Sequence, residues 1–554
     1  MPNPPFATVA NEDQLNQDLA AIAGGTGSYT ITFGSGFTLD TDLLAVNLGA
    51  GGSLTLQGDD QTIDGGGTYR GLFDYAGVLI VDNLTIANAV ARGGNGGSGG
   101  APGGFPGGGG AGLGGGLFVA SAGNATLNNV AFTNDSAIGG NGGSTSSGSS
   151  NAGGGGGGMG GNGSDGVQIV SGGLVQYPGS GGGIGLGATG GDRTNAAGSG
   201  IIPVGGGATI GRGGGTGAGD TYNWTGGGIA PSGLNGAFGG GGAGQNSSAR
   251  GNPGGNGGFG GGGGSGANGG FGGGGGYGGT GGFGGGRSAG GGLGAGGDIF
   301  VQGGGQLTIG VVALNPGTVT GGAGSTGSDR GGSAFGNGIF IQGNQSITFA
   351  PPSGVKTSIS SIIADMNGSA GPSGGAGSVI LNGAGVLQLA GADTYTGGTT
   401  IDGGTLELVT PNAAGTGTIT FLNPGVLQLD SLAAPTNTIS VAGNPVATID
   451  LAALPFVGGA TASLVGNTLS VESGGTTLTL NAVASPNQTI TAPTPDAAGG
   501  TQFSFSVAPV TTEAQFNAQL ALIAGSTVAN VITLAPDSRS TPISAWSISA
   551  SAVR

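Results

Sequence analysis

The sequence has 554 residues, of which 147 are glycine and only 6% are charged. Its formal net charge is −16, histidine and cysteine are absent, and Lys356 is the single lysine. Because nucleic-acid binding needs clustered lysine and arginine, this composition argues against a nucleic-acid partner. It also excludes disulfides and any catalytic or zinc site built on histidine or cysteine.

The first predicted element is a short helix within an N-terminal cap, residues 1–34. Asn11 is suited to cap this helix, and Gln14 follows three residues later, as a capping box requires. One helical face then carries Leu15, Leu19 and Ile22. Residues 29–33 alternate as a strand, and Gly24 and Gly25 separate it from the helix. An amphipathic helix ahead of short strands would cover the open end of a solenoid.

Internal repeats predict that residues 35–140 form rungs of a solenoid. The segment 83–88 matches 129–134, and 93–98 matches 139–144, both at an offset of 46. Each unit reads as short alternating strands, a turn and a glycine-rich excursion, which is typical of stacked repeats. The predicted fold class is therefore all-β, a right-handed parallel β-helix with glycine-rich insertions and a short N-terminal capping α-helix.

The glycine-rich insertion region, residues 141–292, has a three-residue period. Between Pro253 and Ala289, nearly every residue other than glycine falls on one Gly-Gly-X register. A polyproline-II-type helix has three residues per turn, so this period predicts packed polyglycine-II-type helices with every X on one edge. The aromatic members of that edge are the predicted interaction residues, lying on the β-helix or on a partner: Phe259, Phe271, Tyr277 and Phe283. The alternative is a flexible glycine linker, which needs no such phase.

Residues 293–510 are predicted to be further β-helix rungs. The segment 299–303 reads Ile-Phe-Val-Gln-Gly, and 339–343 repeats it as Ile-Phe-Ile-Gln-Gly. No stretch has the roughly 20 apolar residues that span a bilayer, so no membrane insertion is predicted. The first residues lack the features of a signal peptide, so the export signal and any anchor are expected outside this sequence.

The unit near the N-terminus recurs near the C-terminus. At an offset of 501, residues 11–45 resemble 511–554: Glu12 falls on Glu513, Gln14 on Gln515, and 22–24 on 523–525. This duplication predicts that 511–554 begins a second module. It indicates either a longer tandem protein or self-association, head-to-tail or lateral.

Catalytic chemistry has one candidate cluster, in which acidic residues and an arginine gather with Tyr69 and Tyr75: Asp59, Asp60, Asp64, Arg70 and Asp74. An Asp59/Asp64 pair has the residue types for acid–base work on a polysaccharide. Gly-Asp-Asp and Asp-Gly-Gly are also turn sequences, which is the preferred interpretation. No catalytic, cofactor-binding or metal-binding residue is therefore predicted, and no cofactor.

One segment carries a family resemblance. Residues 383–408 resemble the autotransporter-associated β-strand repeat found in passenger domains of type V secreted bacterial proteins. The matching residues are Gly383, Gly385, Leu387, Leu389, Gly391, Thr394, Tyr395, Thr396, Gly397, Gly398, Thr399, Thr400, Ile401, Gly404, Thr405, Leu406 and Leu408. Asp393 stands where the family often has asparagine. The resemblance implies a β-helical passenger that is exported and displayed at the cell surface, as in large surface adhesins.

The expected function is that of a structural or adhesive module of a secreted cell-surface protein, with fibre formation or tandem repetition. Its host or surface ligand is not identified by the sequence. The first alternative is a β-helical carbohydrate-active enzyme, a lyase or hydrolase. The second is an ice-binding surface, since flat threonine arrays and glycine-helix bundles occur in such proteins.

Overall fold

The computed structural model describes residues 8–99, 104–144, 153–170, 174–177, 179–185, 188, 201–204, 208–210, 235–244, 254–325, 330–370, 374–443, 446–524 and 530–534. Pro253, parts of the predicted region 141–292, and residues 525–529 and 535–554 of the predicted second module lie outside these ranges. The chain divides into two compact units. Unit 1 is 1–307, 312–345 and 361–375; unit 2 is 308–311, 346–360 and 376–554.

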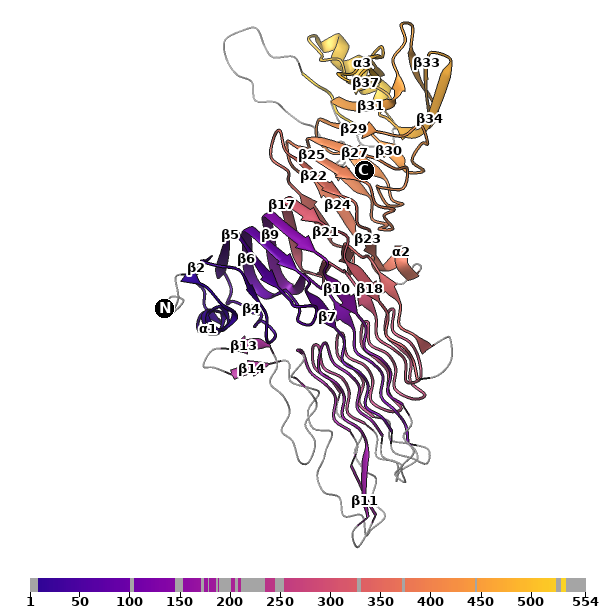
Figure 1. Ribbon diagram of the computed structural model, residues 1–554. Helices are drawn as coiled ribbons and strands as arrows, with labels where there is room; N and C mark the ends of the chain where they lie inside the picture. Colours follow the sequence, from indigo (N-terminus) through magenta and orange to yellow (C-terminus); the bar gives the residue numbers. More distant parts are fainter. Residues whose placement is uncertain are drawn as a thin grey trace. The chain divides into compact units, whose positions relative to one another are not determined.

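The described part of unit 1 contains two α-helices and mostly short strands (Figure 1). The first elements are β1 (Thr8–Val9), α1 (Glu12–Ile22), β2 (Ser28–Phe33), β3 (Phe37–Thr38), β4 (Val46–Asn47), β5 (Ser53–Asp64), β6 (Leu72–Ala87), β7 (Val90–Arg92), β8 (Gly112–Leu113), β9 (Leu117–Thr133) and β10 (Ser136–Ile138). Later elements are β11 (Val167–Val170), β12 (Leu174–Tyr177), β13 (Ile202–Val204), β14 (Ala208–Ile210), β15 (Gly294–Ala295), β16 (Ile299–Val301), β18 (Thr318–Thr320), β19 (Ala334–Phe335), β20 (Ile339–Ile341), β23 (Ile363–Asp365) and α2 (Met366–Ala370). Strand β17 (Gln306–Leu314) contributes residues to both units.

Parallel pairing at the predicted offset builds the long strands of unit 1. β6 pairs with β9 so that Leu79 lies beside Ala125 and Val81 beside Leu127, each 46 residues apart. These side chains are fully buried. The asparagine turn recurs too, because Asn83 and Asn129 both have positive φ and Asn129 Nδ2 donates to Asn83 Oδ1 at 2.9 Å. The prediction of a β-rich chain dominated by parallel strands is confirmed.

The helix and the strand predicted for the N-terminal segment are present as α1 and β2. Asn11 accepts a hydrogen bond from the Gln14 amide at 3.0 Å and caps α1. Leu15, Leu19 and Ile22 are buried, with exposures of 0 to 2%. Glu12 fixes the helix to the following segment by accepting from the Asp40 and Thr41 amides.

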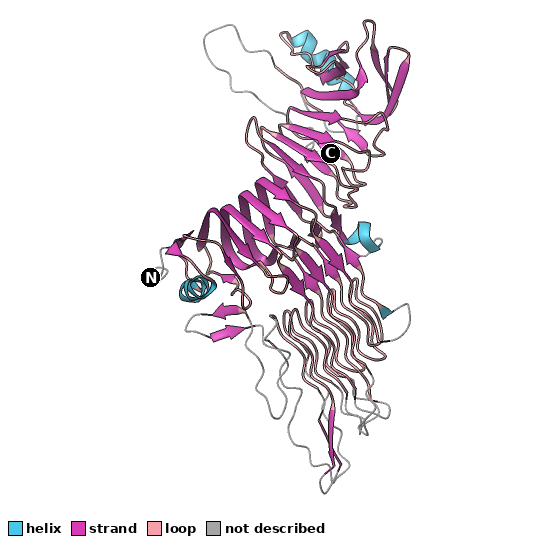
Figure 2. Cartoon of the chain, viewed as in Figure 1, coloured by secondary structure: helices cyan, strands magenta, loops and turns pink. Residues whose placement is uncertain are grey.

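Glycine segments run directly into two small parallel sheets of unit 1. One sheet has the order β18-β10-β7 and the other β19-β15-β8. Figure 2 shows the segments as side-by-side rows without helix or strand. Their backbone amides bond to other segments, as in Gly110 N to Gly94 O and Gly140 N to Gly110 O, both 2.8 Å. A Cβ added at Gly110 would lie 2.0 Å from the Gly158 carbonyl oxygen, so only glycine fits there.

Unit 2 contains a second set of parallel strands and an antiparallel end. Its elements are β21 (Ser346–Phe349), β22 (Lys356–Ile359), β24 (Ser378–Leu381), β25 (Val386–Leu389), β26 (Thr399–Ile401), β27 (Thr405–Leu408), β28 (Ile419–Phe421), β29 (Gly425–Leu429), β30 (Thr438–Ser440), β31 (Val446–Pro455), β32 (Thr461–Val465), β33 (Thr468–Ser473), β34 (Thr476–Val483), β35 (Thr489–Ile490), β36 (Thr494–Pro495), β37 (Gly500–Ser506) and α3 (Glu513–Ile523). Successive strands place Leu389, Leu408 and Leu429 side by side in the core. β31 and β37 pair antiparallel, which ends the parallel series.

Candidate functional site

The predicted interaction residues separate into two places. Phe259, Phe271 and Phe283 stack in one column within unit 1, with ring centroids 5.0 and 5.4 Å apart and rings nearly parallel at 5°. Tyr277 lies elsewhere, 43% exposed, with its ring 4.9 Å from that of Phe105. The prediction of one continuous apolar edge is therefore wrong. The three half-buried phenylalanines and the exposed tyrosine do not lie on the same face.

Chain reversals explain this separation. Gly260, Gly266, Gly272, Gly278 and Gly284 all have positive φ, so the backbone turns back every six residues. The three-residue register therefore alternates between turns at two ends of the glycine block. Phenylalanine occupies the turns that meet the strands, and Tyr277 occupies one of the opposite turns.

A second aromatic column covers the phenylalanine turns. Phe73, Phe118, Phe300 and Phe340 occupy one register position on β6, β9, β16 and β20. Consecutive ring centroids are 4.6, 5.1 and 5.5 Å apart. Phe271 approaches Phe300 edge-on at 6.0 Å. In the sequence, the recurring Leu-Phe and Ile-Phe pairs are the pattern that indicates this aromatic column.

The acidic cluster around residues 59–74 does not form a single site. Asp59 and Asp60 are exposed residues with positive φ at a register irregularity within β5. Asp64 accepts from the Gly66 amide and from Asn88 Nδ2, which is a turn role. Arg70 is buried, donates to the Met159 carbonyl at 3.1 Å, and lies over Phe73 at 5.7 Å. Burial raises the pKa of Asp74 to about 8.

Two further buried acids of unit 1 were missed by sequence reasoning. Burial raises the pKa of Asp135 to about 8. Burial, and then the nearby charge of Asp135, raises the pKa of Asp298 to about 9. Asp135 accepts from the Ala89 amide at 2.8 Å. These raised pKa values favour the protonated carboxyls at neutral pH. Sequence patterns did not indicate their burial, because Asn-Asp-Ser and Gly-Gly-Asp resemble turn sequences.

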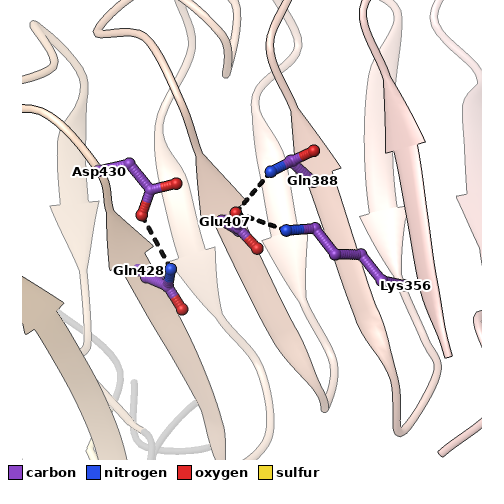
Figure 3. Close-up of polar contacts among 5 residues, drawn as sticks. All are labelled: Lys356, Gln388, Glu407, Gln428 and Asp430. Atoms are coloured by element: carbon purple, nitrogen blue, oxygen red, sulfur yellow. Dashed lines mark hydrogen bonds and ion pairs between the residues drawn. The ribbon is translucent and has the colours of Figure 1, made fainter. Parts of the chain in front are cut away.

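Unit 2 presents a polar row across neighbouring strands (Figure 3). Gln388, Glu407 and Gln428 occupy one register position on β25, β27 and β29. Lys356 Nζ lies 2.8 Å from Glu407 Oε1, and Gln388 Nε2 donates to the same oxygen at 2.5 Å. Gln428 Nε2 donates to Asp430 Oδ1 at 2.8 Å. The row is thus held by contacts between strands.

Charges within this row shift each other's ionisation. Burial favours the protonated form of Glu407, but the bonds from Lys356 and Gln388 outweigh it and lower the pKa of Glu407. Burial and the adjoining Glu407 raise the pKa of Asp430. Among the described residues, no group of three or more acidic side chains is placed to hold a metal ion. The polar row is suited to linking neighbouring strands through side-chain contacts rather than to acid–base chemistry.

Comparison with known families identifies the segment that bears Gln388 and Glu407 of this row. Residues 379–408 match the passenger-associated-transport-repeat family. This segment is a passenger-associated transport repeat. The match runs from within β24 through β27, and it confirms the resemblance to autotransporter passenger domains.

The transport repeat implies a secreted or cell-surface protein. Its Tyr395 is fully buried, and its hydroxyl lies 2.6 Å from Thr399 Oγ1. No curated protein and no solved structure matched the chain. None of the helices in the described ranges has the length and apolar character needed to cross a bilayer.

Proposed function

We propose that this chain is a structural and adhesive module of a secreted bacterial cell-surface protein. The transport repeat carries the proposal, because its strands continue a parallel series instead of standing alone: β25 pairs with β22 before it, and β27 with β29 after it. We further propose that the strand rungs coil as a right-handed parallel β-helix. The glycine segments are then polyglycine-II-type helices, consistent with their three-residue register and their bonds between segments.

The recurrence of the cap supports tandem or head-to-tail assembly. α3 lies 501 residues after α1, and the Val510–Leu534 bridge repeats the Val9–Phe33 pair at the same offset. Thr512 and Gln515 form the capping box. However, α3 has no buried residue, and Leu520 and Leu522 are 42 and 57% exposed. Leu520 holds the position of the buried Leu19 of α1, so this position of α3 is suited to contact a further β-stack.

Tyr277 with Phe105 is an aromatic pair whose tyrosine is exposed enough to contact an external ligand. We assign the interaction role to this pair, and a packing role to Phe259, Phe271 and Phe283. Aromatic rings with a polar end are frequent contributors to binding surfaces.

Electron microscopy and sedimentation over a concentration series test the assembly. The purified chain should form end-to-end particles at high concentration. Leu520→Asp should abolish them, because a charge would then be buried at the contact. Leu422→Asp is the matched control, since Leu422 is 60% exposed but lies outside α3. Monodisperse monomers at high concentration would overturn the assembly proposal.

A further inference from the structure

The described residues of the glycine block in unit 1 form four hydrogen-bonded rows. From one outer side to the other, they are: row 1, residues 93–97, 139–143, 161–164 and 321–324; row 2, 107–111, 153–158, 179–183 and 290–292; row 3, 240–244, 261–264, 273–276 and 285–287; row 4, 235–237, 254–258, 267–270 and 279–282. Gly94 N bonds to Gly158 O between rows 1 and 2, and Gly108 N to Gly263 O between rows 2 and 3. Gly270 N bonds to Gly261 O between rows 4 and 3. Among the described residues, rows 1 and 4 are therefore the outer rows.

An asparagine ladder runs along row 4. The Asn256 amide donates to Asn235 Oδ1 at 2.8 Å, and the Asn268 amide to Asn256 Oδ1 at 3.0 Å. The Thr280 amide donates to Asn268 Oδ1 at 2.9 Å. The three asparagine side chains are exposed, yet each supplies an acceptor oxygen to the next segment.

Row 1 has the same arrangement on the opposite outer face. The Asn95 amide donates to Asn162 Oδ1 at 2.7 Å, and the Asn141 amide to Asn95 Oδ1 at 2.9 Å. The Ala323 amide donates to Asn141 Oδ1 at 2.8 Å. Two outer rows built from different parts of the chain thus have the same ladder of amide-to-asparagine hydrogen bonds.

The last member of each ladder reveals what asparagine does there. Thr280 ends one ladder and Ala323 ends the other, and within the described residues neither passes an acceptor to a further member. A row built to contact a ligand would have no reason to change at its last member. A row built to satisfy the next backbone amide needs asparagine only where another member follows.

The geometry of a glycine lattice explains why an acceptor is required. Inside the block, backbone amides bond to neighbouring segments, but an outer row has no neighbour on its exposed side. The side-chain carbonyl of asparagine accepts the hydrogen bond that a neighbouring segment would otherwise accept. Among the described residues, no backbone amide donates to the carbonyl oxygens of Gly257 and Gly269, so row 4 keeps acceptors while its outward donors are occupied.

We propose that the asparagine ladders close both faces of the glycine block against a further glycine segment, including the block of a second copy of this chain. In each ladder, the backbone amides of the second and later members are already bonded to asparagine side chains, so these positions offer a second face no free backbone donor. Lateral assembly through these faces is therefore blocked, which leaves other surfaces for self-association. This is the glycine-lattice counterpart of protecting an exposed strand edge.

Amide hydrogen exchange combined with sedimentation tests the proposal. Asn256→Ala/Asn268→Ala should speed exchange of the Asn268 and Thr280 amides at least tenfold and produce concentration-dependent association. Asn256→Asp/Asn268→Asp retains an acceptor oxygen, so exchange should stay slow and this association absent. Thr280→Ala is a second control, because no further amide depends on its side chain. Slow exchange of the Gly270 amide verifies that the block remains folded in each variant.

Two outcomes would overturn it. Unchanged exchange in the alanine variant would show that the asparagine acceptors are not needed. Faster exchange without association would show that the ladders serve only their own segments and do not close the faces. If the double alanine variant unfolds, Asn268→Ala alone gives the same readout at the Thr280 amide.

Discussion

At the scale of single residues, the two aromatic columns of unit 1 replace the side-chain packing that glycine cannot provide. Interior glycine segments have no side chains to bury, so the block is attached to the strands through its phenylalanine turns. Phe271 contacts ring neighbours on both sides of its column and Phe300 edge-on. Aromatic pairs of this geometry add about 0.5–1.5 kcal/mol beyond area burial.

Phe271→Ala should therefore reduce the free energy of unfolding of unit 1 by about 3–5 kcal/mol. Tyr277→Ala is the matched control on the same sequence register, and it should cost no more than about 1 kcal/mol because Tyr277 is largely exposed. Urea denaturation checks both values. Equal losses would mean that Tyr277 is as well packed as Phe271.

The buried acids make stability depend on pH. Asp135 and Asp298 stay protonated up to about pH 8 and 9 in the folded state. The same residues lose their protons near pH 4 when unfolded. Between these values the folded state binds more protons, so stability falls as pH rises, by up to about 1.4 kcal/mol per pH unit for each carboxyl.

Asp298→Asn should make this decline between pH 5 and 8 shallower, because asparagine keeps the side chain neutral. Asp59→Asn, at an exposed position within β5, should leave the slope unchanged. Denaturation midpoints measured across this pH range decide the question. A slope in Asp298→Asn equal to that of the original chain would show that Asp298 is ionised in the folded state.

At the scale of elements, the glycine rows tolerate a side chain only where a position faces outward. An added Cβ at Gly332 would lie 1.9 Å from the Gly292 carbonyl oxygen, whereas at Gly331 the nearest atom is 3.7 Å away. Gly332→Ala should therefore lower the melting temperature by several degrees, while Gly331→Ala should be nearly neutral. Thermal unfolding of the two variants checks this, and similar melting temperatures would contradict close packing of these rows.

The two related helices should respond differently to the same substitution. Leu19→Ala on α1 removes a buried side chain and should cost about 2–5 kcal/mol. Leu520→Ala, at the equivalent position on α3, should cost less than about 0.5 kcal/mol in the dilute chain. Chemical denaturation below the association concentration gives both values. A large cost at Leu520 would mean that the α3 face is already covered.

The elements that sequence reasoning placed well are those governed by local periodicity. The helix around Leu15 and Leu19, the strand pairing 46 residues apart and the second helix 501 residues after the first all follow from spacing alone. The aromatic edge failed because a three-residue register does not show where the chain reverses. Positive φ at Gly260 and Gly266 provides the reversals, and glycine was too abundant in the sequence to mark them.

At the scale of the whole molecule, charge opposes self-association. A net charge of −16 makes copies repel each other at low ionic strength, where screening is weak. End-to-end association should therefore strengthen as sodium chloride rises from about 10 to 150 mM, over which the Debye length falls from about 30 to 8 Å. Sedimentation at fixed protein concentration checks this. Weaker association at high salt would instead indicate a contact made by complementary charges.

The sequence by itself determined the β-rich parallel character, the transport repeat, the duplicated cap and the need for glycine, because each depends on residue type and spacing along the chain. Only the tertiary structure decided which repeats pack together and which polar groups become buried. It separated Tyr277 from the phenylalanine turns, placed Asp135 and Asp298 in the interior, and aligned asparagines from distant segments into ladders. The reason is that burial and hydrogen bonding across rows depend on contacts between residues far apart in sequence, which local patterns do not encode.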